Sequence, residues 1–227
     1  MSASAPATGR FILYVQYTNP SGYPPLEHSS RILADAGWRV LFLGTGAFGA
    51  NDLTFPPHPN VSVRLLRFQP PGWKQKLHYL WFVAWCVGVI AARRPTAVYC
   101  SELLSTPVGL AVWLLFRPPV LYHEHDTAGP PPNRFLAVVH QARRRLARVA
   151  VACVIPNHER RAKFDAALRP RRSVCVWNCP TRTEAQPERV RPAGTFTLWY
   201  HGSLTPSQFP LTVIDTLALL PDRVRLK

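Results

Sequence analysis

Short glycine and histidine motifs that mark several common enzyme classes are missing from the places where those classes carry them. No GxGxxG directly follows the first strand-like run, and neither HExxH nor GxxxxGK with a following Ser or Thr occurs in the 227 residues. These glycine patterns form loops that hold phosphate groups, and HExxH binds zinc. A dehydrogenase, a P-loop ATPase and a zinc protease therefore lose their main support.

Acidic residues are scarce, with 12 Asp and Glu against 27 Lys and Arg, which gives a formal net charge of +15. Ten of the basic residues fall between residues 140 and 172, where only two acidic residues occur. The ten are Arg143, Arg144, Arg145, Arg148, Arg160, Arg161, Lys163, Arg169, Arg171 and Arg172. Such a segment attracts nucleic acid, an acidic membrane surface or phosphate-bearing ligands. A merely solvated helix face is the alternative interpretation.

Cysteines are few and odd in number, which argues against a disulfide framework. Cys86, Cys100, Cys153 and Cys175 lie within apolar runs, as buried thiols do in a reducing compartment. Cys179 follows Cys175 closely, but no second ligand pair is near, so a metal site is not expected. The first ten residues lack the apolar core of a signal peptide. A cytoplasmic location follows as the expectation.

Short apolar strands alternate with helices along most of the chain. Strands are expected over residues 11–17, 39–44, 61–68, 97–101, 119–122, 151–155 and 174–177. Helices are expected over residues 26–36, 77–92, 107–116 and 134–149. This alternation predicts an α/β fold, in which a parallel sheet is covered on both faces as in a doubly wound Rossmann-like domain.

The pattern also predicts where domains begin and end. The first domain is expected over residues 10–180, and a polar linker with Pro and Gly over residues 181–195. A strand and a glycine turn then restart at residue 196, followed by a helix near 211–220 and a short strand at 223–226. Residues 196–227 are therefore predicted to be the incomplete beginning of a second domain. Because a strand, a helix and a strand bury little apolar surface alone, we expect this segment to be mobile or loosely docked.

Residues 77–92 (LHYLWFVAWCVGVIAA) form a long apolar run with basic residues on both sides. A spanning helix needs roughly 20 apolar residues, whereas shorter runs are more often buried helices. Aromatic residues and basic flanks also suit a helix that lies in the headgroup region of a membrane. A buried helix, an interfacial helix and a spanning helix all remain open, although the surrounding alternation of strands and helices argues against the span.

The strongest local signal is the segment of residues 120–126 (VLYHEHD). An apolar strand here delivers two histidines and two carboxylates to its carboxyl end, where α/β sheets bind ligands. Alternation places His123 and His125 on one side and the two carboxylates on the other. A polar site for sugar or phosphate, a two-histidine metal site and a structural cluster are the three interpretations.

The order of elements, the segment 119–126 and the restart near residue 196 together resemble the family 4 glycosyltransferases and their GT-B fold of two Rossmann-like domains. In that family the fifth strand commonly ends in His-Asp or His-Glu, and the histidine reaches the transferred sugar across the cleft. The resemblance matches His125 to this histidine and implies that it is catalytic. His123 and Asp126 are then expected beside it in the site.

The segment 19–23 (NPSGY) is similar to the family's glycine-bearing loop after the first strand. That loop borders the acceptor side of the cleft. The resemblance therefore implies that Ser21 and Gly22 contribute to binding.

Two later segments also resemble family motifs. Residues 174–180 (VCVWNCP) are similar to the segment that closes the N-terminal domain, which implies a binding role for Asn178. Residues 198–204 (LWYHGSL) are similar to the opening strand and glycine turn of the donor domain, which implies that Gly202 and Ser203 bind the donor.

The chain departs from the family pattern in the donor half. Residues 203–210 (SLTPSQFP) contain neither the Arg nor the Lys that usually holds the donor diphosphate. The paired glutamates of the family's ExxxxxxxE motif would lie beyond Lys227. The resemblance thus implies an acceptor half with the edge of a donor half, which we expect to be inactive alone.

As a whole, the resemblance implies a retaining glycosyltransferase that takes a sugar from a nucleotide-sugar to a glycan or a lipid-linked acceptor. It implies no metal and no cofactor beyond the nucleotide-sugar as co-substrate. The basic segment and the apolar helix would hold the acceptor or touch an anionic membrane at its cytoplasmic face. A non-catalytic sugar- or nucleotide-binding protein is the first rival. A basic nucleic-acid-binding module is the second, but no recognised motif supports it and nucleic acid is not an expected partner.

Overall fold

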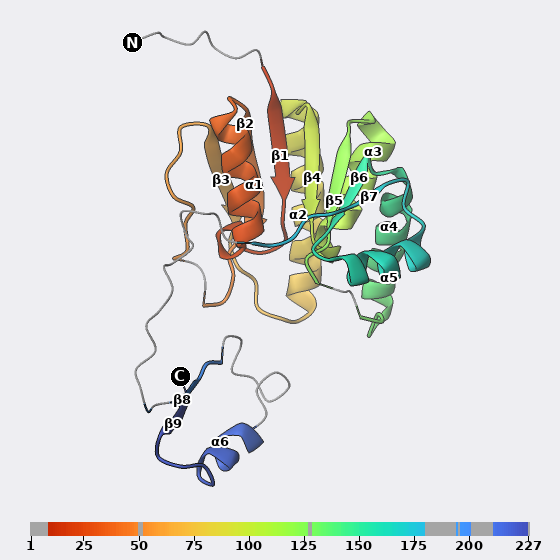
Figure 1. The fold of residues 1–227 in the computed structure, drawn as a ribbon. Coiled ribbons are helices and arrows are strands. Elements are labelled where there is room, and N and C mark those ends of the chain that lie inside the picture. Colours follow the sequence, from red (N-terminus) through yellow and green to blue (C-terminus); the bar gives the residue numbers. More distant parts are fainter. Residues whose placement is uncertain are drawn as a thin grey trace, which may run out of the picture. The chain divides into compact units, whose positions relative to one another are not determined.

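Seven parallel strands form one sheet in the order β3-β2-β1-β4-β5-β6-β7 in the computed structural model (Figure 1). The model describes residues 9–49, 52–126, 129–179, 194, 196–200 and 211–226. The strands of this sheet are β1 (Phe11–Val15), β2 (Arg39–Thr45), β3 (Val61–Leu66), β4 (Ala97–Ser101), β5 (Val120–His123), β6 (Ala152–Ile155) and β7 (Ser173–Cys175). The chain winds outward in one direction from β1 to β3 and in the other from β4 to β7, so the direction reverses between β1 and β4.

Five α-helices and two short 3₁₀ helices connect these strands. The α-helices are α1 (Pro24–Asp35), α2 (Trp73–Arg93), α3 (Thr106–Phe116), α4 (Arg134–Val149) and α5 (His158–Leu168). The 3₁₀ helices, η1 (Pro20–Gly22) and η2 (Leu103–Ser105), follow β1 and β4 at the carboxyl edge of the sheet.

Side chains alternate along the buried strands and form two cores. Leu13 and Val15 of β1 belong to the larger core, to which α2, α3, α4 and α5 also contribute side chains. Tyr14 packs with α1 on the other face, where its ring lies 4.5 Å from the ring of Tyr99. The larger core is closely packed, since a Cβ on Gly109 of α3 would lie 2.6 Å from the sulfur of Cys100. The α/β architecture predicted from the sequence is confirmed.

Helix α2 is apolar around its whole circumference from residue 79 to residue 92, but it is buried on one face only. Its buried side chains are Tyr79, Phe82, Cys86 and Ile90. Its outward side chains include Trp73, Leu77, Leu80 and Trp81, each more than half exposed. In the part of the chain that the structure describes, no helix combines the length and the apolar character needed to cross a bilayer. The burial pattern is that of a helix docked on the sheet.

Most predicted elements appear within a few residues of their expected bounds, and β4 and α4 match them. Helix α5 was not predicted from the sequence. Its 11 residues carry many charges and bury only Phe164 and Leu168, so the apolar periodicity that identifies a helix is weak. A start signal was present, because the side chain of Asn157 caps the helix by accepting from the main-chain N–H of Arg160.

The chain divides into two compact units, Met1–Cys179 and Pro180–Lys227. In the second unit, β8 (Phe196–Leu198) pairs in parallel with β9 (Val224–Leu226), and α6 (Thr212–Leu217) connects them. Helix α6 buries none of its residues. The linker predicted over residues 181–195 lies outside the described residues except for Gly194.

Candidate functional site

The polar residues singled out in the sequence gather where β1, β4 and β5 end. These three strands are neighbours in the sheet, and the chain reverses its winding direction between β1 and β4. Ligands of open α/β sheets bind at this kind of position, outside the carboxyl ends of the strands.

His123 forms the buried base of the site. It is the last residue of β5, and its Nδ1 lies 2.6 Å from the hydroxyl of Tyr99 on β4. Burial raises the pKa of Tyr99 well above its ordinary value, so the phenol keeps its proton and can donate it to Nδ1. Burial also lowers the pKa of His123 to about 3. The ring is therefore neutral at physiological pH, and the donation from Tyr99 places its proton on Nε2.

His125 lies on top of His123, with the two ring centroids 3.7 Å apart. Its Nε2 is 3.0 Å from the hydroxyl of Ser101, and the ring of Tyr23 lies 5.7 Å away. Burial lowers the pKa of His125 to about 4, although Asp126 opposes this shift. Among the contacts of described residues only Nε2 is hydrogen-bonded, which leaves Nδ1 of a neutral ring for a ligand.

Glu102, which the sequence analysis did not select, holds the loop that carries His125. Its carboxylate accepts a hydrogen bond of 3.0 Å from the main-chain N–H of His125. Burial raises the pKa of Glu102 to about 7, and nearby Asp126 and Glu124 add to the shift while the His125 N–H opposes it. The site therefore contains a carboxyl group that titrates near neutral pH, as functional carboxyls often do.

The backbone of Glu102 is strained. Its φ of 68° and ψ of 167° fall in a region that is essentially restricted to glycine. Such strain persists only where surrounding contacts enforce it, and it is typical of functional sites. Here the strained residue directly follows β4 and directs its carboxylate to the end of β5. A carboxylate immediately after a buried strand was the signal in the sequence that could have identified it.

Gln16 is a second residue missed from the sequence. It is the first residue after β1, it is 2% exposed, and its Oε1 has no hydrogen-bond partner among the described residues. Buried polar atoms are rarely left without a partner, so this oxygen indicates a bound water or a ligand hydroxyl. Its amide also supports the hydroxyl of Tyr23, which lies beside His125.

Glu124 and Arg143 lie on the opposite side of the β5 extension, as strand alternation predicts. Two nitrogens of Arg143 donate to the two carboxylate oxygens of Glu124, both at 2.6 Å. The hydroxyl of Tyr122 donates to the same carboxylate at 2.6 Å. Both charged side chains are nearly buried. These paired hydrogen bonds between Arg143 and Glu124, hereafter called the Arg143 fork, join α4 to the end of β5. The fork is structural, because both carboxylate oxygens of Glu124 already accept hydrogen bonds.

Asp126 lies at the outer rim, where its side chain is 86% exposed and 3.6 Å from Arg160. Arg160 belongs to α5 and also donates to the carbonyl of His125 at 2.5 Å. Asp126 and Arg160 line a pocket of about 190 Å³ together with Glu124, Arg143 and Lys163. Arg160 thus holds the carbonyl of His125, whereas Glu102 holds its main-chain N–H. From the sequence, Arg160 was identified only as one of the ten cations of the basic segment.

Ser21 and Gly22 form η1 at the end of β1, next to Tyr23. The turn is held by Asn19, whose side-chain oxygen accepts from the main-chain N–H of Ser21 at 3.0 Å. Gly22 has no positive φ, and a Cβ there would meet only Leu53 at 3.8 Å. The fold itself therefore does not require glycine at this position.

The remaining predicted site residues are less well placed by the described structure. Asn178 is exposed in the loop after β7, at the same edge of the sheet but two strands from β5. Gly202 and Ser203 lie outside the described residues. In the described part of the chain, no three His, Cys, Asp or Glu side chains are grouped as a metal ion would require.

The basic segment is not a uniform positive surface. Four of its ten cations pair with carboxylates: Arg143, Arg160, Arg161 and Lys163. The Arg143 pair is buried, whereas the Lys163 pair is exposed at a distance of 2.7 Å. Part of the positive charge between residues 140 and 172 is thus paired with carboxylates of the same domain.

Comparison with known proteins places these features in a family. The sequence model of the glycosyl transferase 4-like domain matches residues 26–201. No curated protein matches the chain at a significant level.

Three solved structures illustrate the likeness in fold. Sucrose-phosphate synthase from Thermosynechococcus elongatus has a TM-score of 0.72 at 15% identity, over 96% of this chain and 61% of that chain. Anabaena HepE in complex with UDP and glucose has a TM-score of 0.65 at 20% identity, over 96% and 60%. Acinetobacter baumannii MurG has a TM-score of 0.53 at 19% identity, over 86% and 53%.

The fold is therefore of the GT-B type, as the sequence predicted. The chain spans about three fifths of the length of the first two structures.

Proposed function

Because the chain belongs to the family of glycosyl transferase 4-like domains, we propose that it takes part in transferring a sugar from a nucleotide-sugar to a glycan or lipid-linked acceptor, with retention of anomeric configuration. The HepE structures, one in complex with UDP-glucose and one with UDP and glucose, support a nucleotide-sugar donor. The first unit would bind the acceptor. The second unit, with Gly202 and Ser203, would bind the donor.

The observation that carries this proposal is the His125–Glu102 arrangement at the reversal point of the sheet. The loop of His125 is held from two sides, by the carboxylate of Glu102 and by the guanidinium of Arg160. The ring itself is neutral at physiological pH because burial lowers its pKa to about 4. A fixed neutral imidazole can donate or accept one hydrogen bond to a sugar hydroxyl, and it does not bring a charge into the site.

The chemistry proposed requires positioning rather than a covalent intermediate. The acceptor hydroxyl forms a bond to the anomeric carbon on the face from which the bond to the diphosphate oxygen breaks. The hydroxyl proton passes to the departing diphosphate. His125 would hold a hydroxyl of the transferred sugar, and the unpartnered Oε1 of Gln16 would accept from an acceptor hydroxyl. Holding the reactants in this fixed orientation supplies a large part of the rate enhancement of such reactions.

Transfer assays with a panel of radiolabelled UDP- and GDP-sugars test this function. The acceptors would be a lipid extract and a set of oligosaccharides, and both this chain and any longer polypeptide that contains it would be assayed. We expect a labelled product with at least one donor, and product anomers analysed by NMR should keep the donor configuration. An inverted product would contradict the proposed stereochemistry, and failure of every donor with a longer polypeptide would contradict transfer.

A non-catalytic sugar- or nucleotide-binding protein is the second candidate. The absence of Arg and Lys from residues 203–210 favours it, because a donor diphosphate usually needs such cations. Ligand-observed NMR separates the two functions. Saturable binding of a sugar or nucleotide without transfer by any longer polypeptide would support this candidate.

The outward face of α2 suggests where a lipid-linked acceptor would be met. Trp73, Leu77, Leu80 and Trp81 form an exposed apolar stripe, which is hereafter called the α2 stripe. Lys74 and Lys76 flank it in the first turn of the helix. Aromatic and leucine side chains beside lysines are typical of surfaces that rest in the headgroup region of anionic membranes. We therefore propose peripheral contact with the cytoplasmic face of such a membrane.

A further inference from the structure

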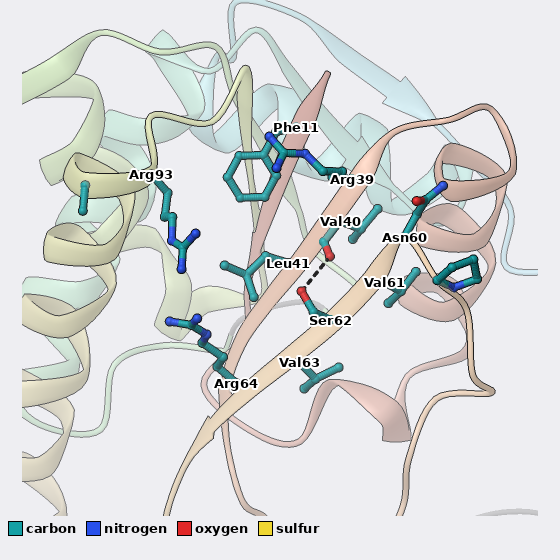
Figure 2. A pocket seen from close by; sticks show the side chains of 12 residues that line it. Phe11, Arg39, Val40, Leu41, Asn60, Val61, Ser62, Val63, Arg64 and Arg93 are labelled. Carbon is teal, nitrogen blue, oxygen red and sulfur yellow. Dashed lines mark hydrogen bonds between the residues drawn. The ribbon is translucent and has the colours of Figure 1, made fainter. Parts of the chain in front are cut away.

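A pocket of about 420 Å³ opens at the edge of the sheet opposite to the histidine cluster (Figure 2). It lies where β1, β2 and β3 begin and where α2 ends. Helix α2 leaves this side of β3 open, so Ser62 and Arg64 are exposed there. No residue of the candidate site lines the pocket, so a ligand here would bind apart from that site.

Three arginines from three different elements meet in this pocket: Arg39 from β2, Arg64 from β3 and Arg93 from α2. Figure 2 shows the side chains of Arg64 and Arg93 directed toward one another across the space between β3 and α2. Arg39 lies against the ring of Phe11, with its guanidinium carbon 5.3 Å from the ring centroid. The ring supports this guanidinium and limits its freedom.

Within the described residues, no carboxylate balances the charge of these arginines. The lining residues include neither Asp nor Glu. Among the residues that the structure describes, none of the three arginines has an ion-pair partner. Like charges directed into one space repel, and an anion placed between them would relieve that repulsion.

Local structure explains the individual arginines only in part. A cation in the last turn of α2 interacts favourably with the helix dipole, which accounts for Arg93. A charge on an edge strand such as β3 discourages pairing with another chain, which accounts for Arg64. Neither reason applies to Arg39, which lies on an inner strand. Neither explains why all three reach the same pocket.

We propose that this pocket binds a small phosphate-bearing anion, either a diphosphate or a phosphomonoester with a small organic group. Guanidinium groups match phosphate oxygens in pairs, which makes arginine suited to this ligand class. The volume falls in the range of small-molecule sites and exceeds the needs of a single phosphate. The ring of Phe11 and the side chain of Leu41, which face the same side of the sheet, supply an apolar wall for the organic part.

Titration of inorganic pyrophosphate into the whole 227-residue chain tests the site. Isothermal calorimetry at low salt would give the affinity, and NMR of the arginine Nε–H groups would show which side chains respond. We expect saturable binding that weakens as salt rises, with shifts at Arg39, Arg64 and Arg93. Binding that does not saturate by about 10 mM pyrophosphate would mean an affinity weaker than that of a millimolar ligand. That result would overturn the proposal.

A matched pair of variants separates the pocket from the general positive charge. The double variant Arg64→Gln/Arg93→Gln should raise the Kd for pyrophosphate by at least about tenfold, whereas Arg144→Gln/Arg145→Gln on α4 should leave it nearly unchanged. All four arginines are exposed, so neither variant should disturb folding. Equal weakening by both variants would mean that pyrophosphate follows net charge, and the site would be rejected. Arg64→Lys should give an intermediate affinity because it keeps the charge but loses the paired hydrogen bonds.

The phosphate could belong to a free metabolite or to a lipid headgroup. Vesicles of phosphatidylcholine with and without phosphatidic acid distinguish these sources, since phosphatidic acid presents a phosphomonoester. Phosphatidic-acid-dependent binding that is lost in Arg64→Gln/Arg93→Gln indicates the lipid source. Binding of pyrophosphate without any effect of phosphatidic acid indicates the free source. If neither probe depends on these two arginines, the pocket is not an anion site.

Discussion

The main-chain N–H of His125 donates a 3.0 Å hydrogen bond to the carboxylate of Glu102, although 23 residues separate the two in sequence. This bond joins the ends of β4 and β5, where a strained residue on one strand fixes the loop that follows the other. Because the strain is enforced by the surrounding structure, it indicates that the position of the His125 ring is important for function.

Replacing His125 by alanine should reduce transfer strongly. We expect kcat/KM to fall by on the order of a hundredfold or more, which is the usual effect of removing one oriented donor from an active site. The measurement requires a polypeptide and a donor for which transfer has been detected. His58→Ala is the matched control, because His58 pairs with the exposed carboxylate of Asp35, outside the histidine cluster, and should leave transfer unchanged. Equal activity of His125→Ala and the unaltered chain would remove His125 from the site.

Glu102→Gln should change how stability depends on pH. The folded chain keeps the Glu102 proton up to a pKa of about 7, whereas the ordinary pKa is 4.5. Folding therefore holds a proton that the unfolded chain has released, and stability falls as the pH rises from about 4.5 to about 7. Glutamine keeps an oxygen for the His125 N–H but does not titrate. Thermal unfolding between pH 4.5 and 8 should show a flatter profile for the variant; identical profiles would contradict a raised pKa.

Buried His123 should have the opposite effect on the pH dependence of stability, because it should lower stability as the pH becomes acidic. The folded chain holds His123 with a pKa of about 3, mainly because of burial, against an ordinary value of 6.5. The unfolded chain thus binds a proton that the folded chain refuses, and stability falls as the pH drops from about 6.5 toward 3. His123→Gln should lose less stability than the unaltered chain over this interval. Urea unfolding at several pH values measures the difference, and parallel losses would show that His123 is not responsible.

Arg143→Ala should be strongly destabilising. It would leave the carboxylate of Glu124 buried without its cation, which typically costs about 3–5 kcal/mol. Lys163→Ala provides the control, since the Lys163–Glu159 pair is short but exposed and such pairs contribute little. Chemical denaturation of both variants tests the contrast. Similar losses of stability in the two would contradict the structural role of the Arg143 fork.

The α2 stripe should mediate salt-sensitive binding to anionic vesicles. We expect flotation with phosphatidylglycerol vesicles, weaker binding at high salt and release by alkaline carbonate, as for a peripheral protein. Leu77→Ser/Trp81→Ser should abolish flotation. Ile32→Ser is the control, because Ile32 on α1 is 69% exposed but belongs to the other face of the sheet. Flotation that survives the double substitution would locate the contact elsewhere.

The sequence by itself determined the architecture and one part of the site. Apolar strands that alternate with helices can bury their side chains only in a parallel sheet with helices on its faces, so β4 and α4 could be predicted to the residue. The polar segment after residue 122 follows a buried strand, and parallel strands all end at the same edge. His123, His125 and Asp126 could therefore be assigned to the ligand-binding edge without a structure.

Only the tertiary structure decided which residues meet those histidines. Glu102 and Gln16 become part of the site because β4 and β1 are neighbours at the centre of the sheet, and strand order is not encoded in any local pattern. Likewise, residues 79–92 of α2 are apolar all round, so their sequence could not say which face is buried. The fork between Arg143 and Glu124 was hidden in a run of basic residues, because charge in a sequence does not reveal which cations the fold has already paired.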